Sequence, residues 1–158
     1  MSKISELFSR PFIPSDYFKT NDRIVIDKES SFGFLMDYNP SNKVTNYQLG
    51  HLEPSLELKE KKNDNQIINL LYETSNHQPV IVSFLDIALH IEKKFELDDF
   101  GSYCEVVYVR VRDEELFSVA IEAIESDRKV WKIKVSSWRF DKKELWPEGV
   151  VFLLKKTN

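Results

Sequence analysis

The residues best suited to chemistry in this chain are its three histidines, its one cysteine and its 26 acidic residues. His51, His77 and His90 are scattered along the sequence, and their spacing matches no metal-binding motif. Asp86 and His90 lie four residues apart, so on a helix they share one face and could hydrogen-bond or offer two metal ligands. Because no third ligand follows, we interpret the pair as part of a solvated helix face.

Cys104 is the one thiol that could act as a nucleophile, and that chemistry needs a histidine base beside it. The surrounding sequence "YCEVVYVRVR" instead predicts a strand in which an unreactive thiol packs. The isolated glycines of "SFGF" and "DDFG" do not form a phosphate-binding loop. We therefore predict a protein that is not an enzyme and that has no catalytic residues, no metal site and no cofactor.

A second kind of chemistry is suggested by Trp131 and Trp138, which alternate with lysines. In a strand Trp131 shares its parity with Ile133 and Val135, so we expect it in the core. Trp138 has the opposite parity. The second face of the predicted sheet would carry Tyr108, Arg110, Arg112, Lys132, Lys134 and Trp138. Such a face could stack bases and neutralise phosphates, although a net charge of −4 disfavours nucleic acid as the partner.

Acidic residues are concentrated between residues 86 and 127, where 12 Asp+Glu stand against 4 Lys+Arg, a balance of −8. They cluster where loops are expected, at Asp98, Asp99, Asp113, Glu114, Glu115, Glu125 and Asp127. Carboxylates presented on loops favour a basic protein partner and accelerate the encounter with it. The alternative explanation is solubility together with the preference of acidic residues for turns.

These residues must be positioned by a helix and a sheet. Apolar residues recur at spacings of three and four between Ile81 and Phe95, which predicts a helix over 79–96 with Pro79 in its first turn. Its polar positions are Ser83, Asp86, His90, Lys93 and Lys94. We expect the apolar stripe to pack on a sheet and these polar residues to face solvent.

Three runs with strand-like alternation follow the helix and predict a β-meander over 103–138. Pairing Arg112 with Leu116 and Glu125 with Lys129 gives one face that is almost wholly apolar. The expected core is Phe84, Leu85, Ala88, Ile91, Val107, Val109, Val119, Ile121, Trp131, Ile133 and Val135.

Weaker patterns complete the predicted fold. We expect a short N-terminal helix at 4–8, strands at 23–27, 31–38 and 149–154, a possible strand at 55–60, and either a strand or a helix at 67–73. Trp146 is expected to plug the core. The predicted fold class is α+β: an antiparallel β-sheet (meander 103–138 plus N- and C-terminal strands) packed on one main helix (79–96), in a single domain, 1–158.

The longest apolar run is shorter than the roughly 18 residues that span a bilayer, the N-terminus lacks the apolar stretch of a secretory signal, and one cysteine cannot form an internal disulfide. We therefore expect a cytoplasmic protein without membrane contact.

In size, acidity and lack of catalytic motifs the chain is similar to bacterial immunity proteins. That similarity implies a non-enzymatic protein-binding module that neutralises a basic toxin such as a nuclease. The alternatives are a nucleic-acid-binding sheet module and a binder of small apolar ligands in a pocket between sheet and helix.

Overall fold

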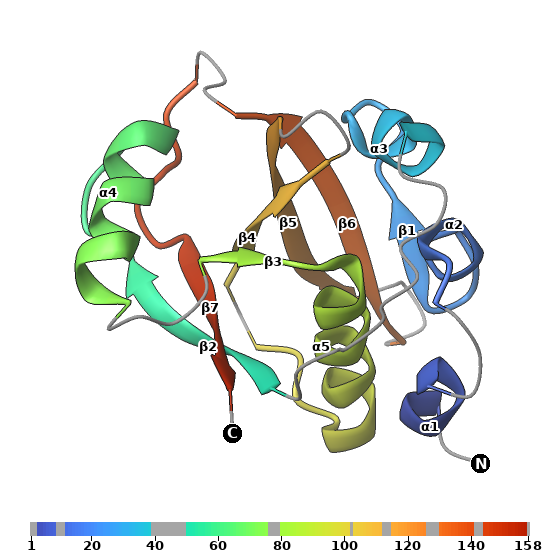
Figure 1. Ribbon diagram of the computed structural model, residues 1–158. Helices are drawn as coiled ribbons and strands as arrows, with labels where there is room; N and C mark the ends of the chain where they lie inside the picture. The colour runs from blue at the N-terminus through green and yellow to red at the C-terminus, as the bar shows by residue number, and fades with distance from the viewer. Residues whose placement is uncertain are drawn as a thin grey trace.

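A computed structural model of the chain contains one mixed sheet of seven strands with helices on both of its faces (Figure 1). The structure describes residues 3–8, 12–38, 50–75, 80–101, 103–111, 115–125, 130–140 and 144–157. The strands are β1 Ile24–Ile26, β2 Gly50–Glu57, β3 Ile81–Val82, β4 Glu105–Arg110, β5 Leu116–Glu125, β6 Trp131–Arg139 and β7 Val151–Thr157. The helices are α1 Lys3–Phe8, α2 Pro14–Tyr17, α3 Phe32–Tyr38, α4 Asp64–Thr74 and α5 Phe84–Leu97.

The predicted meander is present as β4, β5 and β6, which pair antiparallel in chain order. Its register differs from the prediction by two residues in each hairpin, because Arg110 pairs with Leu116 and Glu125 pairs with Trp131. The connecting loops are therefore two residues longer than expected. A shift of two residues leaves every side chain on its predicted face, whereas a shift of one would have exchanged the faces.

The prediction of an antiparallel sheet is wrong. The strand order is β1-β6-β5-β4-β7-β2 with β3 also beside β4, and the pairs β1–β6, β3–β4 and β4–β7 are parallel. Helix α5 connects β3 to β4, and a strand–helix–strand crossover returns the chain in the same direction. The parallel pairs thus join segments separated by long connections, which alternation within single strands does not predict.

The prediction of one main helix is also wrong, because the sheet buries both faces in two separate apolar clusters. On the first face α5 packs against β4, β5 and β6, and α2 and α3 extend this layer towards β1. On the second face α4 and the segment 144–150 cover the sheet, with Trp146 only 4% exposed. In Figure 1, α4 accordingly lies at the side of β7 and β2, and α1 to α3 lie at the side of β1.

Segment 31–38, predicted as a strand, forms helix α3. Phe32, Leu35 and Met36 are buried, and their spacing of three and one is that of one helix face. The ambiguous segment 67–73 is helical as part of α4. There, Asn63 accepts a hydrogen bond from the Gln66 backbone, and the Gln66 side chain accepts one from the Asn63 backbone. This capping box specifies the start of α4.

The long helix predicted over 79–96 begins later, at Phe84. Pro79 lies outside the described residues, and Ile81–Val82 form β3. Ser83 and Asp86 form a second capping box, which sets the start of α5. Asp98 ends the helix with φ 52, in the left-handed region. None of the described helices combines the length and the apolar character needed to cross a membrane.

The other sequence predictions agree with the structure. Ten of the eleven predicted core residues are buried, and Trp131 is partly buried, with its ring stacked on Phe100 at 5.4 Å between centroids. The helix predicted at 4–8 corresponds to α1, and the strands predicted at 23–27 and 149–154 correspond to β1 and β7. The possible strand at 55–60 overlaps β2 only at 55–57. Alternation and apolar spacing thus identified the part of the first apolar cluster that α5 and the meander contribute.

The second apolar cluster is organised around one buried carboxylate. Asp64, the first residue of α4, is 1% exposed, and its Oδ1 accepts hydrogen bonds from the Tyr108 hydroxyl at 2.8 Å and from Trp146 Nε1 at 2.7 Å. One oxygen therefore links α4, β4 and the segment 144–150. Because Tyr108 is fully buried, its hydroxyl would otherwise lack a partner in an apolar environment.

We predict that Asp64→Ala lowers the free energy of unfolding by about 2–4 kcal/mol, because it leaves two buried donors without an acceptor. Urea unfolding followed by tryptophan fluorescence measures the change. The control is Glu73→Ala, an exposed position on the same helix, for which a change below about 0.5 kcal/mol is expected. Equal values for the two variants would contradict a central role for this carboxylate.

Candidate functional site

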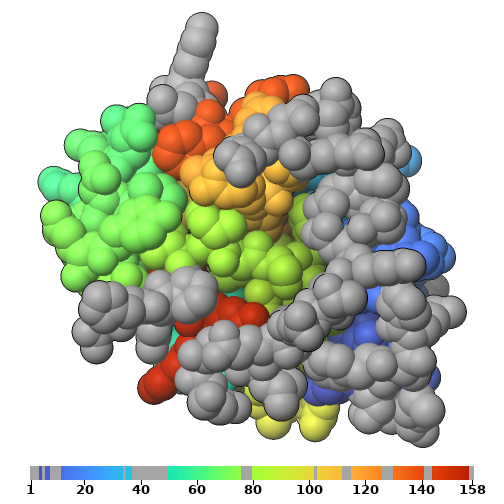
Figure 2. Space-filling model, in the orientation of Figure 1, coloured from blue at the N-terminus to red at the C-terminus, as the bar shows by residue number. Residues whose placement is uncertain are grey.

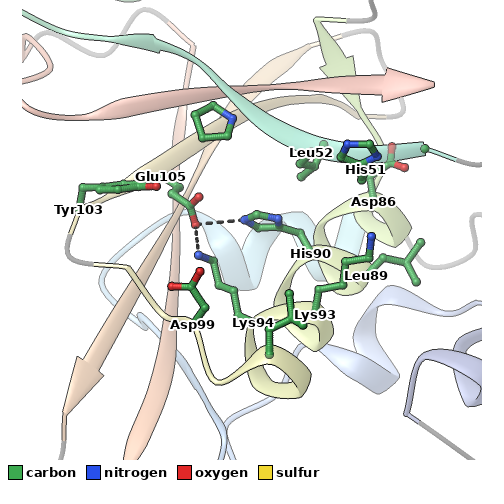
Figure 3. Close-up of a pocket in the computed structure, with 13 residues that line it drawn as sticks. His51, Leu52, Asp86, Leu89, His90, Lys93, Lys94, Asp99, Tyr103 and Glu105 are labelled. Carbon is green, nitrogen blue, oxygen red and sulfur yellow. Dashed lines mark hydrogen bonds and ion pairs between the residues drawn. The ribbon is translucent and has the colours of Figure 1, made fainter. Parts of the chain in front are cut away.

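A cleft of about 240 Å³ lies where α5 meets the beginning of β2 and the segment that leads into β4 (Figure 3). It is lined on one side by α5, from Asp86 to Leu97, and on the other by residues of β2 from Gly50 to Pro54. Tyr103 and Glu105 close it at the entrance to β4. Several of these side chains are charged and buried, and a cleft with buried ionisable groups is a candidate functional site.

Glu105 occupies the floor of the cleft. It is the first residue of β4 and its side chain is 4% exposed. Its Oε1 accepts hydrogen bonds from Lys94 Nζ at 2.6 Å and from His90 Nε2 at 3.0 Å. Burial alone would raise the pKa of Glu105, but the hydrogen bonds and charges of His90 and Lys94 outweigh it, so the pKa lies below its ordinary value of 4.5. Glu105 is therefore a carboxylate at neutral pH.

Asp86 lies one turn before His90 on the same side of α5. Its Oδ1 is 3.0 Å from Nζ of Lys155 on β7, and its Oδ2 accepts hydrogen bonds from the backbone and hydroxyl of Ser83. The side chains of Asp86 and Lys155 are 4% and 11% exposed. The same carboxylate thus caps α5 and joins the helix to the sheet.

The expectation of a solvated helix face at Asp86 and His90 is wrong. Asp86 and Lys94 bond to different strands, and His90, with 13% of its side chain exposed, bonds to Glu105. Of the polar residues predicted on this side, Lys93 is the one that is exposed.

Glu105 and Lys155 were missed as site residues. Each stands beside a run of apolar residues in a strand, and a charged residue at such a position signals a buried partner. The partners lie 15 and 69 positions away in the sequence, so only the fold identifies them.

The outer edge of the cleft is formed by Leu97, Asp98, Asp99 and Tyr103, which we call the rim. Leu97 is 71% exposed and Tyr103 is 42% exposed, and both aspartates are exposed. Partial burial and the nearby carboxylates of Glu105 and Asp99 raise the pKa of Tyr103. The rim therefore places two exposed side chains, one aliphatic and one aromatic, beside two exposed carboxylates.

The predicted acidic-loop residues are separated in the structure. Asp98 and Asp99 lie on the rim, and Glu125 lies at the same end of the sheet, since it pairs with Trp131, on which Phe100 stacks. Glu115 is at the other end of β5, where it forms an ion pair with Arg139 at 2.5 Å. The ten residues of β5 span about 30 Å. Asp113, Glu114 and Asp127 lie outside the described residues.

The predicted basic and aromatic face is covered by the second apolar cluster. Tyr108 is fully buried, and Trp138 is partly buried with its ring edge-on to Trp146 at 5.5 Å. Arg110 is exposed, Lys132 and Lys134 are partly exposed, and Arg112 lies outside the described residues. A base cannot stack on Tyr108 without displacing α4 or the segment 144–150.

A second cavity, of about 230 Å³, lies beside α2 and β1. Glu92, which is 3% exposed, accepts hydrogen bonds from Tyr17 at 2.5 Å and from Arg23 at 2.8 Å, one on each carboxylate oxygen. Burial and the Glu92 charge raise the pKa of Tyr17. Because both oxygens are occupied by residues of the first 25 positions, this network serves to hold the N-terminal segment on α5.

Among the described residues, no group of three or more His, Cys, Asp and Glu side chains has the geometry of a metal site. Cys104 is partly buried directly before β4.

No protein-family model matches the chain, and neither the curated proteins nor the solved structures contain a significant match. The function must therefore be inferred from the cleft and its rim.

We predict that Glu105→Gln lowers the free energy of unfolding by about 3 kcal/mol at pH 7, because Lys94 and His90 lose their charged acceptor. A carboxyl group whose pKa is lower in the folded state stabilises the fold above its unfolded-state pKa. That contribution is lost as pH falls through the folded-state pKa. The difference between wild type and Glu105→Gln should therefore shrink below pH 4.5.

Urea unfolding at pH 7 and at several pH values below 4.5 measures this difference. Glu96→Gln, at an exposed position of the same helix, is the matched control and should give a small difference that does not change with pH. A pH-independent difference for Glu105→Gln would contradict the lowered pKa.

Proposed function

We propose that the protein is a non-enzymatic protein-binding module that contacts a basic partner through the rim of the cleft. The observation that carries this proposal is the exposure of Leu97 and Tyr103 directly beside Asp98 and Asp99. A few apolar or aromatic anchors, surrounded by polar residues, supply most of the energy of a typical protein interface. The aspartates would steer a cationic surface to these anchors.

The proposal includes the role expected from composition, in which a small acidic protein covers the functional site of a basic toxin and acts in the cytoplasm. Association would be accelerated by charge and stabilised by burial of the anchors. The lowered pKa of Glu105 also argues against a role for this carboxylate as a general acid. A general acid or base works best with a pKa near the working pH. His90 and Lys94 lower the pKa of Glu105, which moves it further from neutral pH.

The two alternatives have less support. Nucleic-acid stacking was expected to use Tyr108 and Trp138, whose rings contribute to the second apolar cluster. A small apolar ligand was expected between α5 and the sheet, where the side chains of the first apolar cluster pack instead. The cleft beside α5 is lined in part by charged side chains, with which an apolar ligand would form no hydrogen bond or ion pair.

We predict that Asp98→Asn with Asp99→Asn slows association with the basic partner about tenfold at low salt, and less at roughly 0.5 M salt. Asparagine is chosen because Asp98 has φ 52, a conformation that asparagine tolerates. The partner is first captured on immobilised protein from a nuclease-treated lysate of the native cells, then purified for rate measurements by biolayer interferometry.

The matched control is Glu144→Gln with Glu148→Gln, which removes the same two charges from exposed positions beside α4. Figure 2 shows α4 as a ridge at one side of the molecule and the end of α5, in yellow, at its lower edge. Equal association rates for both double variants at every salt concentration would refute the rim as the contact surface. Failure to retain any basic protein would refute the proposed function itself.

We predict that Leu97→Ser accelerates dissociation of the same partner at least fivefold, a loss of about 1 kcal/mol, because an anchor side chain is removed from the interface. The folded state should be unaffected, since Leu97 is 71% exposed. Leu145→Ser, at a position that is 47% exposed in the segment 144–150, is the matched control. If the two variants dissociate at the same rate, Leu97 is not an anchor.

A further inference from the structure

We propose that the cleft receives an arginine side chain of the basic partner, whose guanidinium group donates to the second oxygen of Glu105. This inference rests on the proposed function, because the arginine is presented by the protein that binds the rim. It assigns a ligand class to the cleft, whereas the proposed function assigns only a partner to its outer edge.

The first argument is the state of the Glu105 carboxylate. Lys94 and His90 both donate to Oε1, and within the described part of the chain no hydrogen bond reaches Oε2. Every fully buried side-chain nitrogen or oxygen of the described residues has a partner, so Oε2 must be accessible from the cleft. In Figure 3 both dashed lines end at one oxygen, and the other is turned away from these donors. A side chain that is 4% exposed thus directs a free acceptor into the cleft.

The second argument is charge. The lining residues include the carboxylates of Asp86, Asp99 and Glu105 and the ammonium groups of Lys93 and Lys94. Asp86 is paired with Lys155, so the carboxylate groups turned to the open space are those of Glu105 and Asp99. The lysine nearest the free oxygen, Lys94, is already paired with the same carboxylate. An anion would approach the second oxygen of Glu105 and the Asp99 carboxylate, whereas a cation could pair with both.

The third argument is the electrostatic and chemical character of the walls. The hydroxyl of Tyr103 points towards Glu105, and the carboxylates of Glu105 and Asp99 contribute to its raised pKa (Figure 3). Leu89, Leu97 and Pro54 provide apolar lining that could cover the methylene groups of a long side chain.

Arginine fits this combination better than lysine. Its planar guanidinium group has several donors in a fixed geometry, so it could bond Glu105 and a second acceptor at once and stack on an aromatic ring. Asp99 and Tyr103 are the acceptor and the ring available at the entrance. A lysine ammonium group would use Glu105 without the stacking contribution.

The test uses blocked arginine, N-acetyl-L-arginine N-methylamide, titrated into the full chain while NMR follows the His90 imidazole and the Glu105 carboxyl carbon. We expect saturable shifts of both signals. The blocked citrulline analogue, which has nearly the same shape without the charge, should bind at least tenfold more weakly, and inorganic phosphate should give no saturable shift. Blocked lysine should bind more weakly than blocked arginine.

Asp99→Asn and Tyr103→Ala, at exposed positions, should each weaken arginine binding at least threefold. Glu148→Gln is the control and should leave arginine binding unchanged.

Equal binding of arginine and citrulline, saturable binding of phosphate, or no saturable shift would overturn the inference. If the partner is still captured in a rim-dependent way in those cases, the proposed function stands and only the arginine site fails. If arginine binds but no basic partner is captured, the proposed function fails, and with it the assignment of the arginine to a partner.

Discussion

The polar side of α5 is buried against β4 and β7, and this contact depends on pairing each buried charge with an opposite one. Asp86 meets Lys155, and Lys94 and His90 meet Glu105. An unpaired charge at any of these positions would carry a large desolvation cost. Since the other side of α5 belongs to the first apolar cluster, the helix is held from both sides.

The same pairing creates the polar floor of the cleft. Glu105 uses one oxygen for the two donors from α5, which leaves the other oxygen facing the open space. At the end of this helix the chain turns through Asp98 in the left-handed region, and that turn exposes Leu97 beside two carboxylates. A stabilising network and a candidate binding surface therefore share one helix.

Glu105 and Glu92 differ in how their two carboxylate oxygens are used. Both are buried carboxylates that contact α5 or belong to it, and both bond two donors. Glu92 receives one donor on each oxygen, so its capacity is used within the protein. In Glu105 the donors share one oxygen, so of these two carboxylates it is Glu105 that retains an acceptor for an external group.

The sequence by itself determined the meander, the faces of its strands, the meander's and the long helix's share of the first apolar cluster, and the existence of that helix, because these depend on periodic patterns between near neighbours. It did not determine the two-residue register shift, since such a shift keeps every side chain on its face. Helix α3 was missed because a short apolar run fits both periods. The parallel pairs, the cover over Tyr108 and the partners of Asp86 and Glu105 were decided only by the tertiary structure. Their physical reason is common to all: each depends on contacts between residues far apart in the chain, and a local pattern carries no information about which distant segment will meet it.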